Sequence, residues 1–109
     1  MSDPAQFGRH AGETLHALHR AVLPAADDFG FDVDFDSGVL TLEFDKTGGK
    51  IIVLPHATAS QVWISDGAKN LKLDWDIVEN DFVLEATGQT LKELLEAAIG
   101  RRVGEDVNL

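Results

Sequence analysis

Alternation of apolar and polar residues along residues 31–36 and 40–45 constrains the fold of this chain more than any other sequence feature. Because side chains in a strand point alternately to the two faces of a sheet, each segment is predicted to be a strand with one buried and one wet face. The residues predicted to face a core are Phe31, Val33, Phe35, Leu40, Leu42 and Phe44. The residues predicted to face water are Asp32, Asp34, Asp36, Thr41, Glu43 and Asp45.

The two residues between these strands, Ser37 and Gly38, are typical of a tight hairpin turn, which sets the register of the pairing. The predicted pairs are Phe35 with Leu40, Val33 with Leu42, Phe31 with Phe44, Asp34 with Thr41 and Asp32 with Glu43. Like charges directly opposite each other on a sheet destabilise it, by up to about 1 kcal/mol. The pair of Asp32 and Glu43 therefore predicts a surface that a cation or a basic partner would stabilise.

The acidic residues are concentrated in this part of the chain. Residues 27–45 hold seven of them and no Lys or Arg, within a chain of formal net charge −10 and pI near 4.5. Nucleic acids and anionic membranes bind proteins through Lys and Arg, so neither is expected as a partner. Cations and basic protein surfaces are the expected ligands, and the alternative that the acids only keep the protein soluble stays open.

The 109 residues are expected to form a single domain over residues 1–109. No apolar run approaches the roughly 18 residues needed to span a bilayer, and no export signal is apparent. Cysteine is absent, which excludes disulfides and thiolate chemistry, so a cytoplasmic protein is expected. Enzymatic activity is not expected, because the chain has no Gly-rich phosphate loop and no nucleophile elbow.

The remaining pattern predicts a helix over residues 5–23 that ends at Pro24, and a capped helix over residues 90–99 that ends at Gly100. Strands are predicted at residues 31–36, 39–45, 50–54, 61–65, 69–75 and 82–86, with Pro55 ending the third of them. The fold class is therefore α+β, a two-layer α-β sandwich. A mostly antiparallel six-stranded sheet carries the N- and C-terminal helices on one face and exposes the other to solvent.

The strand at residues 61–65 places Val62 and Ile64 on one face and Gln61, Trp63 and Ser65 on the other. Trp63 is therefore expected on the polar face of the sheet. Exposed tryptophans are favoured anchors of protein interfaces, so Trp63 is a candidate partner contact. The alternative is an aromatic side chain that packs on its neighbours, whereas Trp75 is expected in the core.

Several motifs, taken in order, resemble the frataxin family, including its bacterial iron-donor members. Residues 38–44 (Gly-Val-Leu-Thr-Leu-Glu-Phe) followed by residues 49–53 (Gly-Lys-Ile-Ile-Val) are similar to the first hairpin of that family. Residues 61–63 (Gln-Val-Trp) resemble its Gln-hydrophobic-Trp signature on the exposed sheet face. Residues 73–75 (Leu-Asp-Trp) and 88–91 (Gly-Gln-Thr-Leu) are similar to later segments of the family.

The resemblance implies an accessory protein of iron-sulfur cluster assembly, acting as an iron chaperone or as a regulator of sulfur transfer. Such a protein binds iron through an acidic ridge and contacts a cysteine desulfurase and its iron-sulfur scaffold protein. By position, Asp28, Asp32 and Asp34 match the ridge, and Gln61 with Trp63 matches the partner site on the sheet. A monomer is expected, and iron-dependent oligomers are left open.

Iron, as Fe2+ or Fe3+, is expected to bind weakly and at several sites, whose candidate ligands are Asp27, Asp28, Asp32, Asp34, Glu43 and His19. Carboxylates at i and i+2 on one strand face lie roughly 7 Å apart, which suits loose, partly water-mediated binding of a hard cation. His19 shares a predicted helix face with Glu13 and His16 and could add a nitrogen ligand, although a solvated helix surface is the simpler interpretation.

A different class of function remains as the alternative, namely a small acidic protein-binding chaperone with no metal role. Such a protein would usually dimerise, and it would have no need for Asp32 to face Glu43. Dimer formation without any response to metal would favour it.

Overall fold

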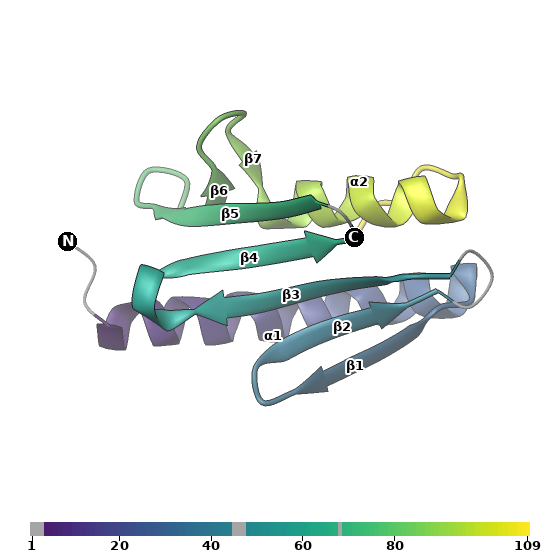
Figure 1. Ribbon diagram of the computed structural model, residues 1–109, viewed down its shortest axis with the longest axis horizontal. Coiled ribbons are helices and arrows are strands. Elements are labelled where there is room, and N and C mark those ends of the chain that lie inside the picture. The colour runs from purple at the N-terminus through teal and green to yellow at the C-terminus, as the bar shows by residue number, and fades with distance from the viewer. Residues whose placement is uncertain (1–3, 45–47, 68) are drawn as a thin grey trace.

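The computed structural model describes residues 4–44, 48–67 and 69–109, in which two helices cover one face of a seven-stranded antiparallel sheet (Figure 1). The elements in chain order are α1 (Pro4–Phe29), β1 (Asp32–Asp36), β2 (Val39–Glu43), β3 (Lys50–His56), η1 (Ala57–Ala59), β4 (Gln61–Asp66), β5 (Lys69–Asp76), β6 (Asp81–Leu84), β7 (Gln89–Thr90) and α2 (Leu91–Val103). The predicted fold class is confirmed. The prediction of six strands missed β7, which is two residues long and pairs with β6.

The sheet is a meander in which each strand pairs with the next one along the chain. In its first hairpin, Asp32 pairs with Glu43 and Phe35 with Leu40, as predicted. Ser37 and Gly38 form the turn with φ values of 53° and 80°, a conformation whose twist matches that of the flanking strands. Asp45, which was predicted to face water at the end of the second strand, lies outside the described residues.

The core lies between the helices and the inner face of the sheet. It is formed by one stripe of α1, one stripe of α2 and alternate residues of the strands. Its fully buried members include Leu15, Val22, Leu40, Leu42, Ile51, Val53, Val62, Ile64, Leu73, Phe82, Leu95 and Ile99. Phe31 and Phe44, predicted to be paired, are also buried, with ring centroids 4.8 Å apart. Neither helix within the described part of the chain is long and apolar enough to cross a membrane.

The prediction that the first helix ends at Pro24 is wrong, because α1 continues to Phe29. Pro24 is exposed, so its ring lies on the solvent side of the helix. A proline there removes one backbone hydrogen bond, but Ala25 is buried and Phe29 packs against the core on the same stripe as Val22. Packing of that stripe therefore carries the helix past the proline.

The prediction that Pro55 ends the third strand is also wrong, since β3 continues through Pro55 to His56. The last pair between β2 and β3 joins Leu40 to Val53, so at Pro55 only β4 is a neighbour, through Val62. The strand is locally an edge at this point, where a residue without an N–H is tolerated. This extension brings His56 opposite Gln61.

The final helix begins as predicted, with Thr90 as its N-cap and a complete capping box to Glu93. Its predicted end at Gly100 is wrong, because the helix continues to Val103 and is capped by Gly104, which adopts φ 74° and donates its N–H to the Gly100 carbonyl. A Cβ at Gly100 would lie 3.0 Å from the Glu105 carbonyl oxygen, so glycine here allows the C-terminal segment to fold back closely. Val107 of that segment is buried in the core.

Thr90→Ala is expected to lower the free energy of unfolding by about 1 kcal/mol, because it removes the hydroxyl that accepts the Glu93 N–H. Urea unfolding monitored by circular dichroism measures this cost. Thr58→Ala in η1, at an exposed threonine, is the control and should change the free energy by a few tenths of a kcal/mol at most. Equal costs for the two variants would contradict a role for the cap.

Candidate functional site

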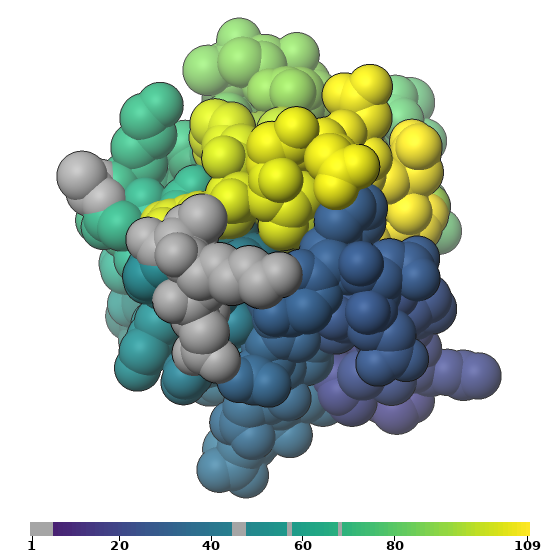
Figure 2. All heavy atoms as spheres, turned by 90° about the vertical axis from the view of Figure 1, so that its right-hand side faces the viewer, coloured from purple at the N-terminus to yellow at the C-terminus, as the bar shows by residue number. Residues whose placement is uncertain are grey.

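Acidic residues gather where α1 turns back into β1. Asp27 and Asp28 are exposed in the last turn of α1, and Asp32 and Asp34 are exposed on β1. Only residues 30–31 connect the two elements. Gly30, at φ 73°, donates its N–H to the Ala26 carbonyl at 2.8 Å and closes the helix. These four acids and Glu43 on β2 form what we call the acidic edge. Figure 2 views this end of the molecule, where the connection between α1 and β1 lies at the surface (blue).

The acidic edge keeps most of its charge. Asp32 lies opposite Glu43, as predicted. Glu43 also pairs with Lys50 on β3, and the Lys50 Nζ lies 3.8 Å from the Glu43 Oε1. Both partners of this ion pair are exposed, so its contribution to stability is small. Among the residues that the structure describes, the other four acids of the edge make no ion pair. The edge is therefore a surface of unneutralised carboxylates.

The edge is open and does not enclose a site. Within the described ranges, no group of three or more His, Cys, Asp or Glu residues lies close enough to hold a metal ion together. Asp32 and Asp34 project from the same strand face, where side chains two residues apart are roughly 7 Å apart. A cation at this edge would take one or two carboxylates and complete its coordination with water, which is the loose mode expected from the sequence.

The structure places His19 away from the strand acids. Its ring stacks on Phe35, with centroids 4.9 Å apart, and Phe35 packs on the core side of β1. Asp32 and Asp34 project to the opposite side of that strand. Glu13, which the sequence grouped with His19, instead lines a cavity with His10 on the other flank of α1. His19 and the acids of β1 thus lie on opposite faces of that strand, and metal binding by His19 stays a prediction.

Trp63 lies half-buried on the outer face of the sheet, as predicted, and Gln61 holds it in place. The indole Nε1 donates to the Gln61 Oε1 at 3.0 Å, and the Gln61 Nε2 donates to the Asp74 Oδ1 at 3.1 Å. Gln61 therefore joins the indole on β4 to a carboxylate on β5. The two residues that the sequence proposed as a partner site are in direct contact.

Neighbouring strands also hold the indole. His56 on β3 stacks on Trp63 with ring centroids 4.1 Å apart and an interplanar angle of 12°. Lys72 on β5 places its Nζ 4.9 Å from the indole centroid. We call Gln61, Trp63, His56, Lys72 and Asp74 the Trp63 cluster. His56 was not among the predicted site residues, because the third strand was predicted to end at Pro55; a strand that continues through Pro55 places His56 opposite Gln61.

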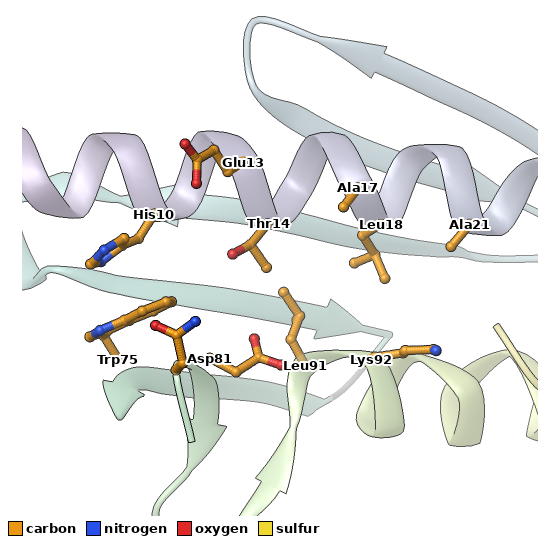
Figure 3. Close-up of a pocket in the computed structure, with 11 residues that line it drawn as sticks. His10, Glu13, Thr14, Ala17, Leu18, Ala21, Trp75, Asp81, Leu91 and Lys92 are labelled. Carbon is orange, nitrogen blue, oxygen red and sulfur yellow. The ribbon is translucent and has the colours of Figure 1, made fainter. Parts of the chain in front are cut away.

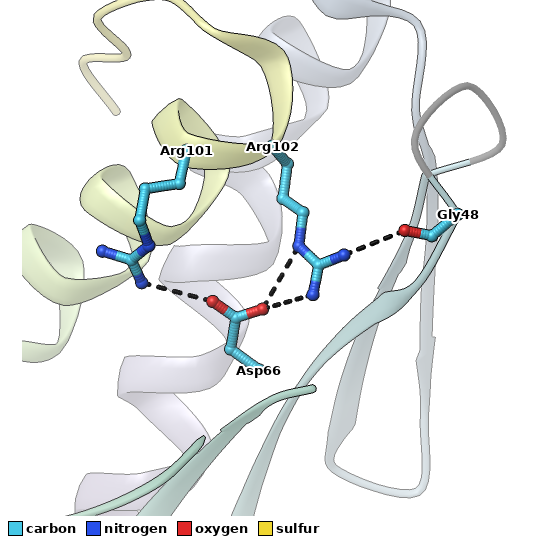
Figure 4. A network of polar contacts seen from close by, with 4 residues as sticks. All are labelled: Gly48, Asp66, Arg101 and Arg102. Atoms are coloured by element: carbon cyan, nitrogen blue, oxygen red, sulfur yellow. Dashed lines mark hydrogen bonds and ion pairs between the residues drawn. The ribbon is translucent and has the colours of Figure 1, made fainter. Parts of the chain in front are cut away.

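A third group of polar residues locks α2 to the sheet (Figure 4). Asp66, at the end of β4, accepts hydrogen bonds from Arg101 Nη2 at 3.2 Å and from Arg102 Nε at 3.2 Å and Nη2 at 2.5 Å. Arg102 Nη1 also donates to the Gly48 carbonyl at 2.9 Å. Burial raises the pKa of Asp66, but the hydrogen bonds and charges of Arg102 and Arg101 outweigh it, so the pKa lies below its usual value.

The comparisons with known proteins bear on this arrangement. A family model described as a frataxin-like domain matches residues 1–105. This chain belongs to the frataxin-like family. The resemblance noted in the sequence is thereby confirmed, and it extends over nearly the whole frataxin-like chain.

Curated relatives of this frataxin-like chain carry the name iron-sulfur cluster assembly protein CyaY. The protein of that name from Thioalkalivibrio sulfidiphilus (strain HL-EbGR7) is 31% identical over 103 residues, which cover 94% of this chain and 95% of the relative. Another, from Pseudomonas entomophila (strain L48), is 31% identical over 98 residues, or 88% of each chain.

Solved structures show the same fold. A frataxin from Psychromonas ingrahamii superposes with a TM-score of 0.81 at 21% identity, covering 98% of this chain and 97% of the other. Yeast frataxin superposes with a TM-score of 0.70 at 18% identity, covering 92% of this chain and 82% of the other. The sandwich of two helices on an antiparallel sheet is therefore the fold of frataxins.

Proposed function

We propose that this chain is an accessory protein of iron-sulfur cluster assembly that binds iron weakly at its acidic edge and docks on a cysteine desulfurase and its iron-sulfur scaffold protein. Membership of the frataxin-like family and relatives named for iron-sulfur cluster assembly support this role. The observation that carries the proposal is the acidic edge itself, whose carboxylates are exposed and, apart from Glu43, without an ion-pair partner among the described residues.

The chemistry of the edge fits iron as a cargo. Carboxylate oxygens are hard ligands that suit Fe2+ and Fe3+, and exposed single carboxylates hold a cation loosely enough to release it. The same negative surface attracts a basic partner over distances of about 10 Å at ordinary ionic strength. An iron chaperone and a regulator of the desulfurase would both use this edge.

The Trp63 cluster supplies the second contact of the proposal. Its indole is large, half-exposed and held by Gln61 and His56, so docking would cost little ordering of the side chain. Attraction at the acidic edge would bring a basic partner to the molecule, and packing on Trp63 would fix its position.

An anaerobic Fe(II) titration of the 15N-labelled protein, followed by its amide signals, tests the iron site. Signals of residues 27–36 and Glu43 are expected to broaden first, because iron would bind near their carboxylates. Signals of the Trp63 cluster should stay sharp at the same iron ratio. If several-fold excess iron caused no selective broadening, the iron role would be abandoned and a protein-binding module without metal would be the better account.

Replacing two acids of the edge should affect iron binding and stability in opposite directions. Asp32→Asn with Asp34→Asn is expected to weaken Fe(II) binding several-fold, since two of the proposed ligands lose their charge. It should also raise the free energy of unfolding by up to about 1 kcal/mol, because Asp32 faces Glu43. Calorimetric titration and urea unfolding measure the two effects.

The matched control is Glu79→Gln with Glu85→Gln, which changes the net charge equally at exposed residues in the turns around β6. It should leave both iron affinity and stability close to those of the unaltered protein. If the control weakened iron binding as much as the edge variant, the overall charge of the protein would be responsible and the edge would not be a site.

A further inference from the structure

A groove runs between α1 and the elements β5, β6 and α2, on the flank of α1 that faces away from β1 (Figure 3). It encloses a cavity of about 430 Å³, and its apolar wall is made by Ala17, Leu18, Ala21 and Leu91. His10 and Trp75 close one end of it as a stacked pair with ring centroids 3.8 Å apart. This volume lies within the range of sites that hold a side chain or a small ligand.

The charges that line the groove are mainly negative. Glu13 and Asp81 line the cavity together with one ammonium group, that of Lys92. An adjoining cavity of about 560 Å³ shares His10, Trp75 and Asn80 with the first and adds the carboxylate of Asp74. Asp81 is partly buried, and burial together with the charge of Glu93 raises its pKa above the usual value. A cationic group would complement these carboxylates.

Two apolar side chains project into solvent beside the groove. Ile77 and Val78, in the turn between β5 and β6, are 86% and 90% exposed, and Ile77 lines the second cavity. The turn is held in this form, because Asp76 Oδ1 accepts the N–H groups of Val78 at 2.8 Å and Glu79 at 3.1 Å. The apolar pair is thus presented on a fixed turn at the mouth of an acidic groove.

We propose that this groove is a second docking surface, which binds a basic amphipathic segment of a partner protein. A Lys or Arg side chain of the segment enters the cavity beside Asp81 and Glu13, and its aliphatic side chains cover Ile77 and Val78. Apolar contacts next to complementary charges are the pattern of specific protein interfaces, whereas a small cation alone would leave the exposed pair uncovered.

The proposed surface is separate from the acidic edge. The edge lies around β1, the first strand of the sheet, whereas the groove lies beside β5 and β6, near the other side of the sheet. Along α1, Glu13 and Asp28 are fifteen residues apart, which corresponds to about 22 Å of helix. One partner could thus occupy the edge while a second segment occupies the groove, and the groove does not depend on the iron role.

The test uses the full 15N-labelled chain and a short synthetic peptide of leucine, lysine and arginine. The same peptide with glutamate for its basic residues is one comparison, and N-acetylarginine amide alone is another. Variants for the groove are Asp81→Asn and Ile77→Ser with Val78→Ser, and the charge-matched control is Asp106→Asn, at an exposed residue of the C-terminal segment outside both the groove and the acidic edge. Asparagine at position 81 keeps an oxygen to accept the Phe82 N–H, so the fold should be retained.

The expected result is a set of shifted signals at the Trp75 indole, at residues 77–81 and at residues 13–21. Each groove variant should weaken peptide binding by about five- to tenfold, and Asp106→Asn should leave the affinity unchanged. The proposal is overturned if Asp106→Asn weakens peptide binding as much as Asp81→Asn, or if the glutamate peptide binds equally well. It is also overturned if arginine amide binds as tightly as the peptide, which would indicate a small-molecule site. Light scattering that shows a dimer abolished by Ile77→Ser with Val78→Ser would overturn it in favour of a second copy of this chain.

Discussion

Replacing Asp66 with asparagine is expected to lower the free energy of unfolding by about 2–3 kcal/mol. The Asp66 side chain is only 13% exposed, and its carboxylate accepts the hydrogen bonds that tie α2 to the sheet through Arg101 and Arg102. An amide cannot match both guanidinium groups, so Arg102, with a side chain 21% exposed, would be left without its charge partner. Urea unfolding monitored by tryptophan fluorescence gives the cost.

Two comparisons make this prediction specific. Asp106→Asn, at an exposed residue of the C-terminal segment, should change the free energy by a few tenths of a kcal/mol at most. Asp66→Asn combined with Arg102→Met should cost less than the sum of the single variants, because both remove the same contact. Additive costs would show that Asp66 and Arg102 act independently and would refute the coupling.

The contribution of Asp66 should depend on pH in one direction. Its pKa in the folded protein lies below the usual aspartate value of 3.8, so the stability it adds is present above that pH and is lost as the pH falls through the folded pKa. The difference in free energy of unfolding between the unaltered protein and Asp66→Asn should therefore shrink as the pH is lowered below about 4. A difference that grew on acidification would contradict this assignment.

Trp63→Ala is expected to weaken binding to the cysteine desulfurase of the same organism by roughly 30-fold, about 2 kcal/mol, on the basis of the proposed function. The indole is the largest half-exposed group on the outer sheet face, and its contacts to Gln61 and His56 hold it ready for an interface. The cost to folding stability should be smaller than the cost to binding, because Trp63 lies outside the buried core. Calorimetric titration and thermal unfolding measure the two quantities.

Leu23→Ala is the control for this prediction, since Leu23 is an exposed apolar residue (45%) on α1 and makes none of the contacts of the Trp63 cluster. It should leave desulfurase affinity unchanged. If Trp63→Ala destabilised the fold as strongly as it weakened binding, the indole would be a packing residue and the sheet face would lose its proposed role.

The register of the first hairpin could be predicted from the sequence, and the ends of its strands to within two residues. Period-two alternation assigns each side chain to a face, and a two-residue turn leaves one register that puts all the apolar residues together. Both signals are local, and they agreed at every pair from Asp32 with Glu43 to Phe35 with Leu40. The orientation of Trp63 followed from the same rule.

The ends of the helices could not be predicted in the same way. Pro24 and Gly100 are local stop signals, but whether a helix stops depends on what the following residues can pack against. Phe29 packs against the core beyond Pro24, and Gly100 allows the C-terminal segment to approach the helix closely. A more extended α1 also moves Asp27 and Asp28 from a loop onto the last turn of the helix.

Polar contacts between segments far apart in the chain could not be predicted from the sequence. The contact of Asp66 with Arg102 joins residues 36 positions apart, and the groove beside Trp75 needs α1, β5, β6 and α2 together. The adjacent residues Arg101 and Arg102 indicate a possible ion pair at the end of the last helix, because charged residues are seldom buried unless paired, but they do not identify Asp66 as the partner. Nothing in residues 10–21 alone indicates a cavity.

The meander topology has a consequence for how the molecule assembles. Because every strand pairs with its neighbour along the chain, the sheet can grow one hairpin at a time with short loops to close, which favours rapid folding. The contacts that join residues far apart in the chain are those between the two helices and the sheet. The core stripe of α1 is covered only when the strands have formed, and the contact of Arg102 with Asp66 joins residues 36 positions apart, so it closes a longer loop than the hairpin turns do. We expect this contact to form late in folding, so weakening it should speed unfolding more than it slows folding.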